Sequence, residues 1–513
     1  MTVWLLGDQL HPGVTPLQST DHVLLVEAYQ FAERRRYHPQ KLTLVFSAMR
    51  HFRDDLRDRG YDVTYLRAET FGDALDRYFE ANPADDLVAM RSPSHGADEW
   101  RQRLVRERGG TLTLVENDLF LTSPATFDAW AGVDGSDEGD SGEPDADEET
   151  TFRQEDWYRH VRRETGILMA GAEPVGGAWN YDEENRETPP PEWSPPEVPR
   201  FEPDETTREV QAFVADRYGD HWGDPNGFRW PVTREAALQA LDHFVSVRLP
   251  EFGAYQDAMR GGEWALCHSL LAAAMNLGLL RPREVVDPAV EAYESGDAPL
   301  NSVEGFVRQV IGWREFMRHV YRRSMPELAS ANQLGQTASL PPLYWDGETE
   351  MRCLSEAVEH VHDRGYAHHI ERLMVLSNFA LIYGVDPAEL NEWFHLGFVD
   401  AYHWVTTPNV VGMGSFGTDV LSSKPYAASA NYIDKMSDYC ADCPYAKSKT
   451  TGENACPFNA LYWDFLKRNE ETLRGTGRMG LMYAHVDRKD DAEWRAIRER
   501  ADDLRSAAAE GEL

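Results

Sequence analysis

Val3-Trp4-Leu5-Leu6 is the first of six short apolar runs near the N-terminus, and Gly7-Asp8-Gln9 follows it directly. The six runs lack strict apolar–polar alternation, which is typical of strands that are buried on both faces. The distances between them suit crossover helices. The other five runs are residues 23–26, 42–46, 63–66, 87–90 and 112–115. This pattern predicts a doubly wound α/β domain with a parallel sheet over residues 1–130.

Polar residues follow two of these runs. Gly7-Asp8-Gln9 ends the first run, and Ser47-Ala48-Met49-Arg50 links the run 42–46 to a helix. Because ligands of doubly wound sheets bind at the carboxyl ends of strands, we expect both segments to line a crevice there. No G-x-G-x-x-G motif accompanies Gly7, so a simple turn is the plainer interpretation of that glycine.

The composition changes after residue 130. Residues 133–150 are acidic, rich in glycine and nearly free of apolar side chains, which predicts a loop or linker insertion. Prolines at 189–196 then predict a stiff connector that reaches residue 229, so that residues 131–229 join two domains. From 230 to 513, apolar residues recur at helical spacing, which predicts a large all-helical domain. The clearest examples are Leu266-Leu270-Leu271-Ala274, Phe306-Val310-Trp313-Met317 and Leu373-Leu376-Phe379-Ala380.

The chain has 513 residues and a formal net charge of −36. No apolar run approaches the ~20 residues needed to cross a bilayer, and the N-terminus lacks the order of a secretion signal, so we expect a cytoplasmic protein. The charge argues against nucleic-acid binding, which depends on Lys and Arg. However, widespread acidic residues with few lysines are typical of a surface adapted to high salt, where repulsion is screened. Local basic stretches such as 314–323 then matter more, although a solvated helix face explains this stretch equally well.

Only five cysteines are present, which makes a disulfide framework a poor explanation. Cys440-Ala441-Asp442-Cys443 and Cys456 lie close in sequence, and Cys353 completes a set of four thiolates. One remote ligand with one short loop suits a [4Fe-4S] cluster, whereas four-cysteine zinc sites usually have two close pairs. Zinc and unliganded cysteines stay open from spacing alone. Cys267 lies in an apolar run and is most simply a small buried hydrophobe.

His369 and Arg372 lie three residues apart, on one face of a predicted helix. An imidazole can donate a proton near neutral pH, and an arginine can hold an anion or a carboxylate. Taken alone, the adjacent pair His368-His369 is more often structural. Core packing is likewise the plainer interpretation of the tryptophans in this part of the chain, which are Trp313, Trp345, Trp393 and Trp404.

Longer motifs resemble one protein family. Ile311-Gly312-Trp313-Arg314-Glu315-Phe316 is similar to the W-R-E-F signature of the photolyase and cryptochrome superfamily, and residues 366–374 with Asp400 resemble its flavin-binding core. A narrower similarity is to the iron-sulfur bacterial cryptochromes and photolyases, which include the prokaryotic (6-4) photolyases. The segments that carry it are 6–10, 45–52, 366–369, 424–429, 436–440 and 455–465. The resemblance covers nearly the whole chain except the acidic insertion.

The resemblance implies three cofactors. Cys353, Cys440, Cys443 and Cys456 would hold a [4Fe-4S] cluster. The α/β domain would hold an antenna, 6,7-dimethyl-8-ribityllumazine, near Gly7, Asp8 and Glu27. The helical domain would bind FAD, and its contacts would be His268, Ser269, Leu270, Leu271, Gln309, Arg372, Asp400 and Thr406.

The resemblance also implies roles in the reaction. His369, with His368 beside it, would face the lesion and act in proton transfer, while Trp393 and Trp345 would relay electrons from the surface to the flavin. Two positions depart from the family pattern. Thr406 stands where (6-4) relatives carry a carboxylate near the flavin, and Phe394 replaces a tyrosine beside the relay tryptophan.

The resemblance therefore implies a monomeric, light-driven repair enzyme for (6-4) photoproducts in UV-damaged DNA, which would flip the lesion out of the stack. The alternative is a cryptochrome that has the same cofactors and signals to a protein partner in blue light. A third hypothesis is a zinc-containing helical interaction protein without flavin.

Overall fold

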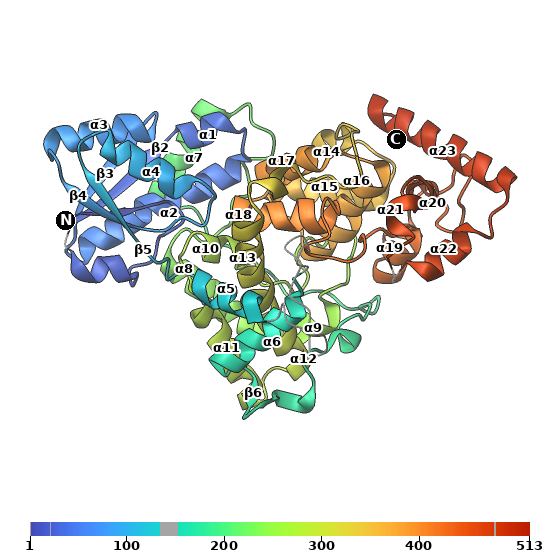
Figure 1. Ribbon diagram of the computed structural model, residues 1–513, viewed down its shortest axis with the longest axis horizontal. Helices are drawn as coiled ribbons and strands as arrows, with labels where there is room; N and C mark the ends of the chain where they lie inside the picture. The colour runs from blue at the N-terminus through green and yellow to red at the C-terminus, as the bar shows by residue number, and fades with distance from the viewer. Residues whose placement is uncertain (1, 21, 134–151, 477–478) are drawn as a thin grey trace.

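A five-stranded parallel sheet forms the N-terminal end of the molecule in the computed structural model, which describes residues 2–20, 22–133, 152–476 and 479–513 (Figure 1). The strand order is β3-β2-β1-β4-β5, so the chain leaves the central strand first in one direction and then in the other. This topology confirms the predicted doubly wound α/β fold. The strands are β1 (Thr2–Leu5), β2 (His22–Ala28), β3 (Asp62–Ala68), β4 (Asp86–Met90) and β5 (Thr111–Val115).

Both faces of the sheet are covered, which explains the apolar runs without alternation. Val3 and Leu5 pack with α2 (Pro39–Asp58) into the larger core, whereas Trp4 faces the opposite side. There it packs into a smaller core that α3 (Phe71–Ala81) and α4 (Ala97–Arg106) complete. Helix α7 (Glu205–Tyr218) packs in turn on the outside of α2.

The prediction of a strand at 42–46 is wrong, because these residues lie inside α2. The helix is sandwiched between the sheet and α7, and residues 39–50 are all buried. A helix that is buried on every side loses the polar stripe that marks helical periodicity. Pro39 begins the helix, and the His38 side chain accepts a hydrogen bond from the Gln40 N–H. The segment 47–50 therefore lies within a helix and not at a strand end.

The connector has more structure than its composition suggests. The acidic segment predicted at 133–150 lies almost entirely outside the described residues. After it, α6 (Gln154–Thr165) packs against the helical region, while residues 186–204 contain no helix or strand. The domain boundaries stay a prediction.

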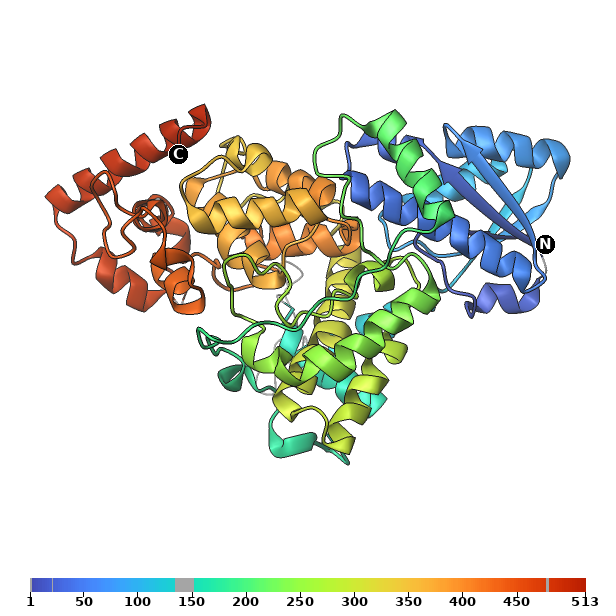
Figure 2. The same cartoon turned by 180° about the vertical axis from the view of Figure 1, so that it is seen from behind.

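The remainder of the chain is mostly helical, and its last helix lies at the opposite end of the molecule from the sheet in both views (Figures 1 and 2). The helices predicted at 306–317 and 373–380 are confirmed. The first consists of α12 (Leu300–Val307), η5 (Arg308–Arg314) and α13 (Glu315–Ser324), and the second of η7 (Glu371–Ser377) and α16 (Asn378–Tyr383). The other helices are α1 (Gln30–Arg34), α5 (Pro124–Val133), α8 (Arg234–His243), α9 (Leu249–Tyr255), α10 (Ala272–Asn276), α11 (Pro282–Ser295), α14 (Leu343–Asp346), α15 (Arg352–Arg364), α17 (Pro387–Gly397), α18 (His403–Thr407), α19 (Ala430–Met436), α20 (Pro457–Arg468), α21 (Glu470–Leu473), α22 (Gly480–Val486) and α23 (Asp491–Glu510).

Two sequence interpretations in this region are wrong. Leu266 and Leu270 have φ of 42° and 59°, so the segment before α10 is a turn and not a helix. The stretch 314–323 is neither a free basic patch nor a solvated face, because residues 315–321 are buried. Its exposed Arg322 and Arg323 both pair with Asp128.

Polar contacts fix the sheet domain onto the helical region. The Gln40 amide donates to the carbonyl oxygens of Asp224, Asn226 and Asp363 at 2.8–2.9 Å. The Leu10 N–H donates to the Leu277 carbonyl at 2.9 Å, immediately before Gly278. No helix among the described residues is long and apolar enough to cross a membrane.

Gly278 tests how tightly this junction is packed. Gly278 and Gly227 both have left-handed φ, of 83° and 68°, so alanine at either costs about 1–2 kcal/mol in backbone strain. Only at Gly278 would a Cβ also meet neighbours, at 2.9 Å from the Leu10 nitrogen and from a Leu119 methyl group. Gly278→Ala should therefore lower the free energy of unfolding by at least about 1 kcal/mol more than Gly227→Ala, measured by denaturant unfolding. Equal losses would contradict the close approach.

Candidate functional site

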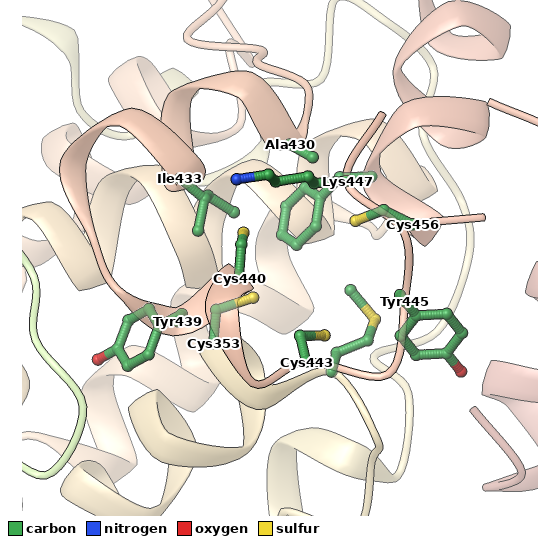
Figure 3. Close-up of a pocket in the computed structure, with 11 residues that line it drawn as sticks. Cys353, Ala430, Ile433, Tyr439, Cys440, Cys443, Tyr445, Lys447 and Cys456 are labelled. Carbon is green, nitrogen blue, oxygen red and sulfur yellow. The ribbon is translucent and has the colours of Figure 1, made fainter. Parts of the chain in front are cut away.

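Four of the five cysteines surround one cavity (Figure 3). Cys353 comes from the first turn of α15, Cys440 from η9 (Tyr439–Ala441), Cys443 from the loop after η9, and Cys456 from the residue before α20. All four are free thiols, and Met351, Ile433 and Phe458 contribute apolar walls. Three separate elements thus bring the predicted ligand set together, although these residues are up to 103 positions apart (456 − 353).

The four thiols line this cavity together with Lys447 and Tyr445. Among the described residues, no group of three or more Cys, His, Asp or Glu side chains is arranged to hold one metal ion. Tetrahedral zinc draws four sulfur atoms around a single ion, whereas a cluster of several iron atoms occupies a volume between its ligands. The cavity offers four thiols, a ligand set that either kind of centre uses. Cys267 is buried in the large core, apart from this cavity, as expected.

Arg372 and Asp400 form a two-bond ion pair, with both N–O distances at 3.0 Å. Arg372 also donates from Nε to the Ala367 carbonyl at 2.6 Å and lies 4.3 Å from the centre of the Phe398 ring. Asp400 is almost fully buried, whereas Arg372 is a quarter exposed. The pair therefore holds a guanidinium in a fixed orientation at the edge of a solvent-accessible space.

Three histidines lie next to this pair. The rings of His268 and His368 stack at 4.9 Å with an interplanar angle of 11°, and both are buried. The neighbouring His369 side chain is exposed, yet burial of its surroundings, together with Arg372 and His368, lowers its pKa to about 4. His369 is therefore neutral at pH 7.

Several buried polar atoms here have no hydrogen-bond partner among the described residues. They are Nε2 of His268, both ring nitrogens of His368 and Nε of Arg248. The Arg248 guanidinium donates to the carbonyl oxygens of His268 and Ser269. Buried polar groups are normally satisfied, so a bound polar group fits this space. The left-handed Leu270 turns the segment 268–271 around the Arg248 side chain.

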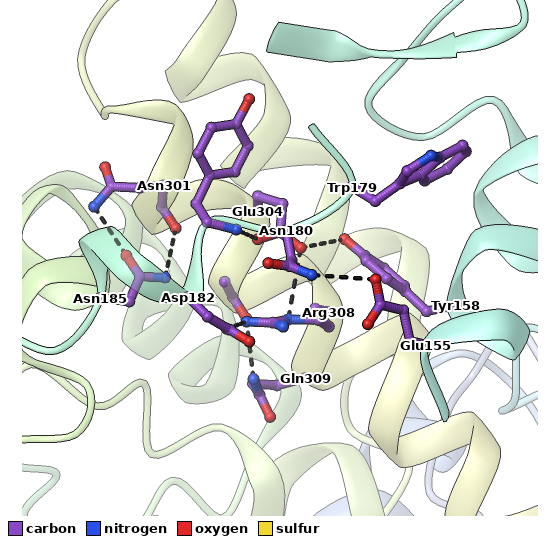
Figure 4. Close-up of polar contacts among 12 residues, drawn as sticks. Glu155, Tyr158, Trp179, Asn180, Asp182, Asn185, Asn301, Glu304, Arg308 and Gln309 are labelled. Atoms are coloured by element: carbon purple, nitrogen blue, oxygen red, sulfur yellow. Dashed lines mark hydrogen bonds and ion pairs between the residues drawn. The ribbon is translucent and has the colours of Figure 1, made fainter. Parts of the chain in front are cut away.

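The other predicted cofactor contacts lie in nearby elements. Thr406 is buried in α18, and Gln309 is in η5, where its amide donates to the Gly305 carbonyl at 3.2 Å. Arg308, beside Gln309, pairs with Asp182 and lies 3.6 Å from buried Glu304 (Figure 4). Tyr158 donates to the same Glu304 at 3.0 Å. These charges fix the segment after α6 onto η5.

One functional candidate was missed by sequence reasoning. Glu371 is fully buried and accepts hydrogen bonds from His360 Nδ1 at 3.1 Å and from the Tyr439 hydroxyl at 2.8 Å. His368 Nε2 lies 3.7 Å from its carboxylate. Burial alone would raise the pKa of Glu371, but these histidines and the tyrosine lower it to about 2. Its position between His368 and Arg372 in the sequence was the only available signal.

Gly7 and Asp8 follow the carboxyl end of β1, as predicted for this segment, and Glu27 lies near the carboxyl end of the adjacent β2. Glu27 is fully buried and accepts hydrogen bonds from both Arg50 and the Tyr65 hydroxyl. Burial raises the pKa of Asp8 to about 6, which Arg101 partly opposes. This edge therefore combines one fully paired carboxylate with one carboxyl group whose pKa lies closer to neutral pH than usual.

The two predicted relay tryptophans differ in exposure. Trp393 in α17 is buried, and its indole N–H donates to the Tyr344 carbonyl at 2.9 Å. Trp345 in α14 is 38% exposed. Both rings contact a third ring, Trp222, which the sequence did not single out.

The chain is similar to several known proteins. Residues 3–230 match the family model described as deoxyribodipyrimidine photo-lyase-related protein. The chain is 41% identical to a (6-4) photolyase of Agrobacterium fabrum over 94% of each sequence. The fold resembles a bacterial class III photolyase from Agrobacterium tumefaciens (TM-score 0.57, 16% identity, 99% of this chain and 97% of that chain). It also resembles a Synechocystis cryptochrome (TM-score 0.57, 14% identity, 91% and 89%).

The Arg372–Asp400 pair can be tested against an exposed pair of the same type. Asp400→Asn would leave the guanidinium without its counter-charge, and breaking one partner of a buried pair costs about 3–5 kcal/mol. Asp128→Asn removes the exposed partner of Arg322 and Arg323, and should cost about 1 kcal/mol or less. Denaturant unfolding of both variants checks this order. Similar losses would mean that the buried pair contributes little to stability.

Proposed function

The chain belongs to the photolyase and cryptochrome superfamily and is a DNA photolyase, and we propose that it uses light to reverse (6-4) pyrimidine photoproducts. One observation supports the (6-4) photoproduct as the lesion that is repaired. Exposed His369 lies beside the Arg372–Asp400 pair, in a chain that is 41% identical to a (6-4) photolyase. A positioned imidazole is the group expected to move a proton on a substrate in this space.

Members of this superfamily use FAD, which supplies light-driven one-electron transfer when bound. We propose that it is held by residues from four segments, and the unpartnered buried nitrogens of His268 and Arg248 support this. Arg372 would present its guanidinium to the flavin, oriented by Asp400. The set comprises His268, Ser269, Leu270, Leu271, Gln309, Arg372, Asp400 and Thr406.

The damaged nucleotide would enter this space from the DNA, because its atoms cannot be reached inside the base stack. His369, neutral at pH 7, would keep one proton on a ring nitrogen that faces the lesion, and His368 would support its orientation from the buried side. Negative charge from the DNA backbone would raise the pKa of His369 and so increase the fraction of its imidazolium form, which is the form that can donate a proton. Because the chain carries a charge of −36, we expect binding to depend on shape and flipped-base contacts in high salt.

Two further cofactors form part of the proposal. The cavity lined by Cys353, Cys440, Cys443 and Cys456 supports a [4Fe-4S] cluster, and the edge formed by Gly7, Asp8 and Glu27 supports a lumazine antenna. Of these last three residues, Asp8 is the stronger candidate for a direct contact, because Glu27 already bonds to Arg50 and Tyr65.

Repair of a defined lesion tests the function. Chemically reduced protein should restore the bases of DNA with one (6-4) lesion in light and not in the dark, and it should leave a cyclobutane dimer unchanged. His369→Ala should lower the repair rate about 100-fold or more while FAD stays bound, since a general acid contributes about 10²–10⁴. The matched control is His22→Ala, because His22 is an exposed histidine in the sheet domain.

A flavin-containing protein that repairs neither lesion would favour a cryptochrome. Full repair by His369→Ala would contradict the role of this residue in proton transfer, while the photolyase assignment would stand.

Cysteine substitution tests the cluster. Cys353→Ala should abolish most bound iron and acid-labile sulfide, because one of four ligands is lost. Cys267→Ala removes a cysteine of the large core and should keep the iron content of the natural protein. Elemental analysis of the purified proteins gives the answer. Zinc in place of iron, or unchanged iron in Cys353→Ala, would overturn the cluster proposal.

A further inference from the structure

Trp222 lies between the two tryptophans of the proposed electron relay. Its ring centre is 5.5 Å from that of Trp345 and 6.0 Å from that of Trp393. Its indole N–H also donates to the Trp345 carbonyl oxygen. No ring contact joins Trp345 directly to Trp393 in the part of the chain that the structure describes. Trp222 is therefore the aromatic side chain that closes the gap between the buried and the exposed tryptophan.

The other aromatic neighbours of Trp393 are poorly suited to this position. Tyr344 contacts Trp393 at 5.2 Å, but its hydroxyl donates to the Leu376 carbonyl, and burial raises its pKa. A phenol gives up an electron readily only when its proton can leave to a base, and a carbonyl is not one. Phe394, at 5.3 Å, has no ionisable proton and is much harder to oxidise than an indole. Trp222 has neither problem, since an indole can be oxidised while it keeps its N–H.

The segment around Trp222 is fixed in place, although it belongs to the connector before α8. The Asp224 N–H donates to the His362 carbonyl at 2.7 Å, and the Gln40 amide bonds to the Asp224 carbonyl. The ring also packs near Gly397, where a Cβ would lie only 3.3 Å from it. A fixed ring at constant distance from both neighbours is what repeated electron transfer requires.

We propose that Trp222 is the middle member of a three-tryptophan relay, so that electrons pass from Trp345 through Trp222 to Trp393. The proposal rests on the proposed function, in which a bound flavin would supply light-driven one-electron chemistry and Trp393 would give one electron to it. Trp222 would then return one electron to Trp393, and Trp345 would return one to Trp222. No bond breaks in these steps. These steps leave an electron vacancy on exposed Trp345. A thiol in solution fills this vacancy and is oxidised to a thiyl radical.

Exposure gives the relay its direction. Trp393 is 1% exposed, Trp222 is half-buried and Trp345 is 38% exposed. Water stabilises a positive charge better than the apolar interior does, so the vacancy moves outward. Each step away from the flavin also slows the return of the electron, which leaves the thiol time to react.

The test compares Trp222→Phe with Tyr344→Phe, which alters the other aromatic ring beside Trp393. Under light with a thiol, the rate of flavin photoreduction in Trp222→Phe should be at least about ten-fold lower than in the natural protein. In Tyr344→Phe the same rate should stay within about two-fold of the natural protein. Transient absorption should show a tryptophan radical that decays faster in Trp222→Phe. FAD content and thermal unfolding should be unchanged. Photoreduction at the natural rate in Trp222→Phe would overturn the proposal.

A second variant covers the case in which Trp222→Phe folds poorly. In Trp345→Phe the vacancy would stop at half-buried Trp222, which thiols can still reach, so partial photoreduction should remain. If the vacancy instead passed directly between Trp393 and Trp345, it would stay on buried Trp393 and photoreduction would be lost. That loss would also overturn the proposal. Chemically reduced Trp222→Phe should repair DNA normally, because its flavin does not need the relay. A failure of repair in the natural protein would therefore count against the proposed function and not against the relay.

Discussion

The buried carboxylate of Glu371 joins three parts of the site that are distant in sequence. It accepts hydrogen bonds from His360 in α15 and from Tyr439 beside the cysteine cavity, and it lies next to His368. Its pKa of about 2 means that it is ionised at neutral pH, so the fold has to supply these partners. If the cysteine loop moved, Tyr439 would leave and a buried charge would lose a donor. The order of the cysteine loop and the orientation of the histidine segment are therefore energetically linked, even though the cavity and the histidines are separate.

A second link connects this region to the sheet. The Lys41 ammonium in α2 is buried and donates to the carbonyl oxygens of His395 and Ala401, which flank Asp400 in the sequence. Burial lowers the pKa of Lys41 to about 7. The helix that covers the sheet thus reaches the loop that orients Arg372. An antenna at the edge of the sheet and a flavin beside Arg372 would be held at a fixed distance by this helix, which is what energy transfer between them requires.

The sequence predicted those features that have a local signature. Apolar runs revealed five strands, and the unusual spacing of four cysteines identified residues that meet at one cavity. The prediction failed where burial removes the pattern, as in α2, whose residues 39–50 are covered on all sides. It also failed at 266–271, where left-handed leucines interrupt a helical spacing. Glu371 and Trp222 could not be found in this way, because their importance comes from neighbours that only the fold brings together.

Phe394 and Trp222 are best understood together. A tyrosine beside Trp393 could carry an oxidising equivalent only with a nearby proton acceptor, and the two rings that contact Phe394, those of Trp393 and Phe398, are not proton acceptors. An interior of this kind favours carriers that do not need to lose a proton. Trp222 meets this requirement from outside the helical core, on a connector that Gln40 and His362 anchor. The connector would then have a function of its own: besides joining the two domains, it would supply the ring through which the buried end of the relay reaches the surface.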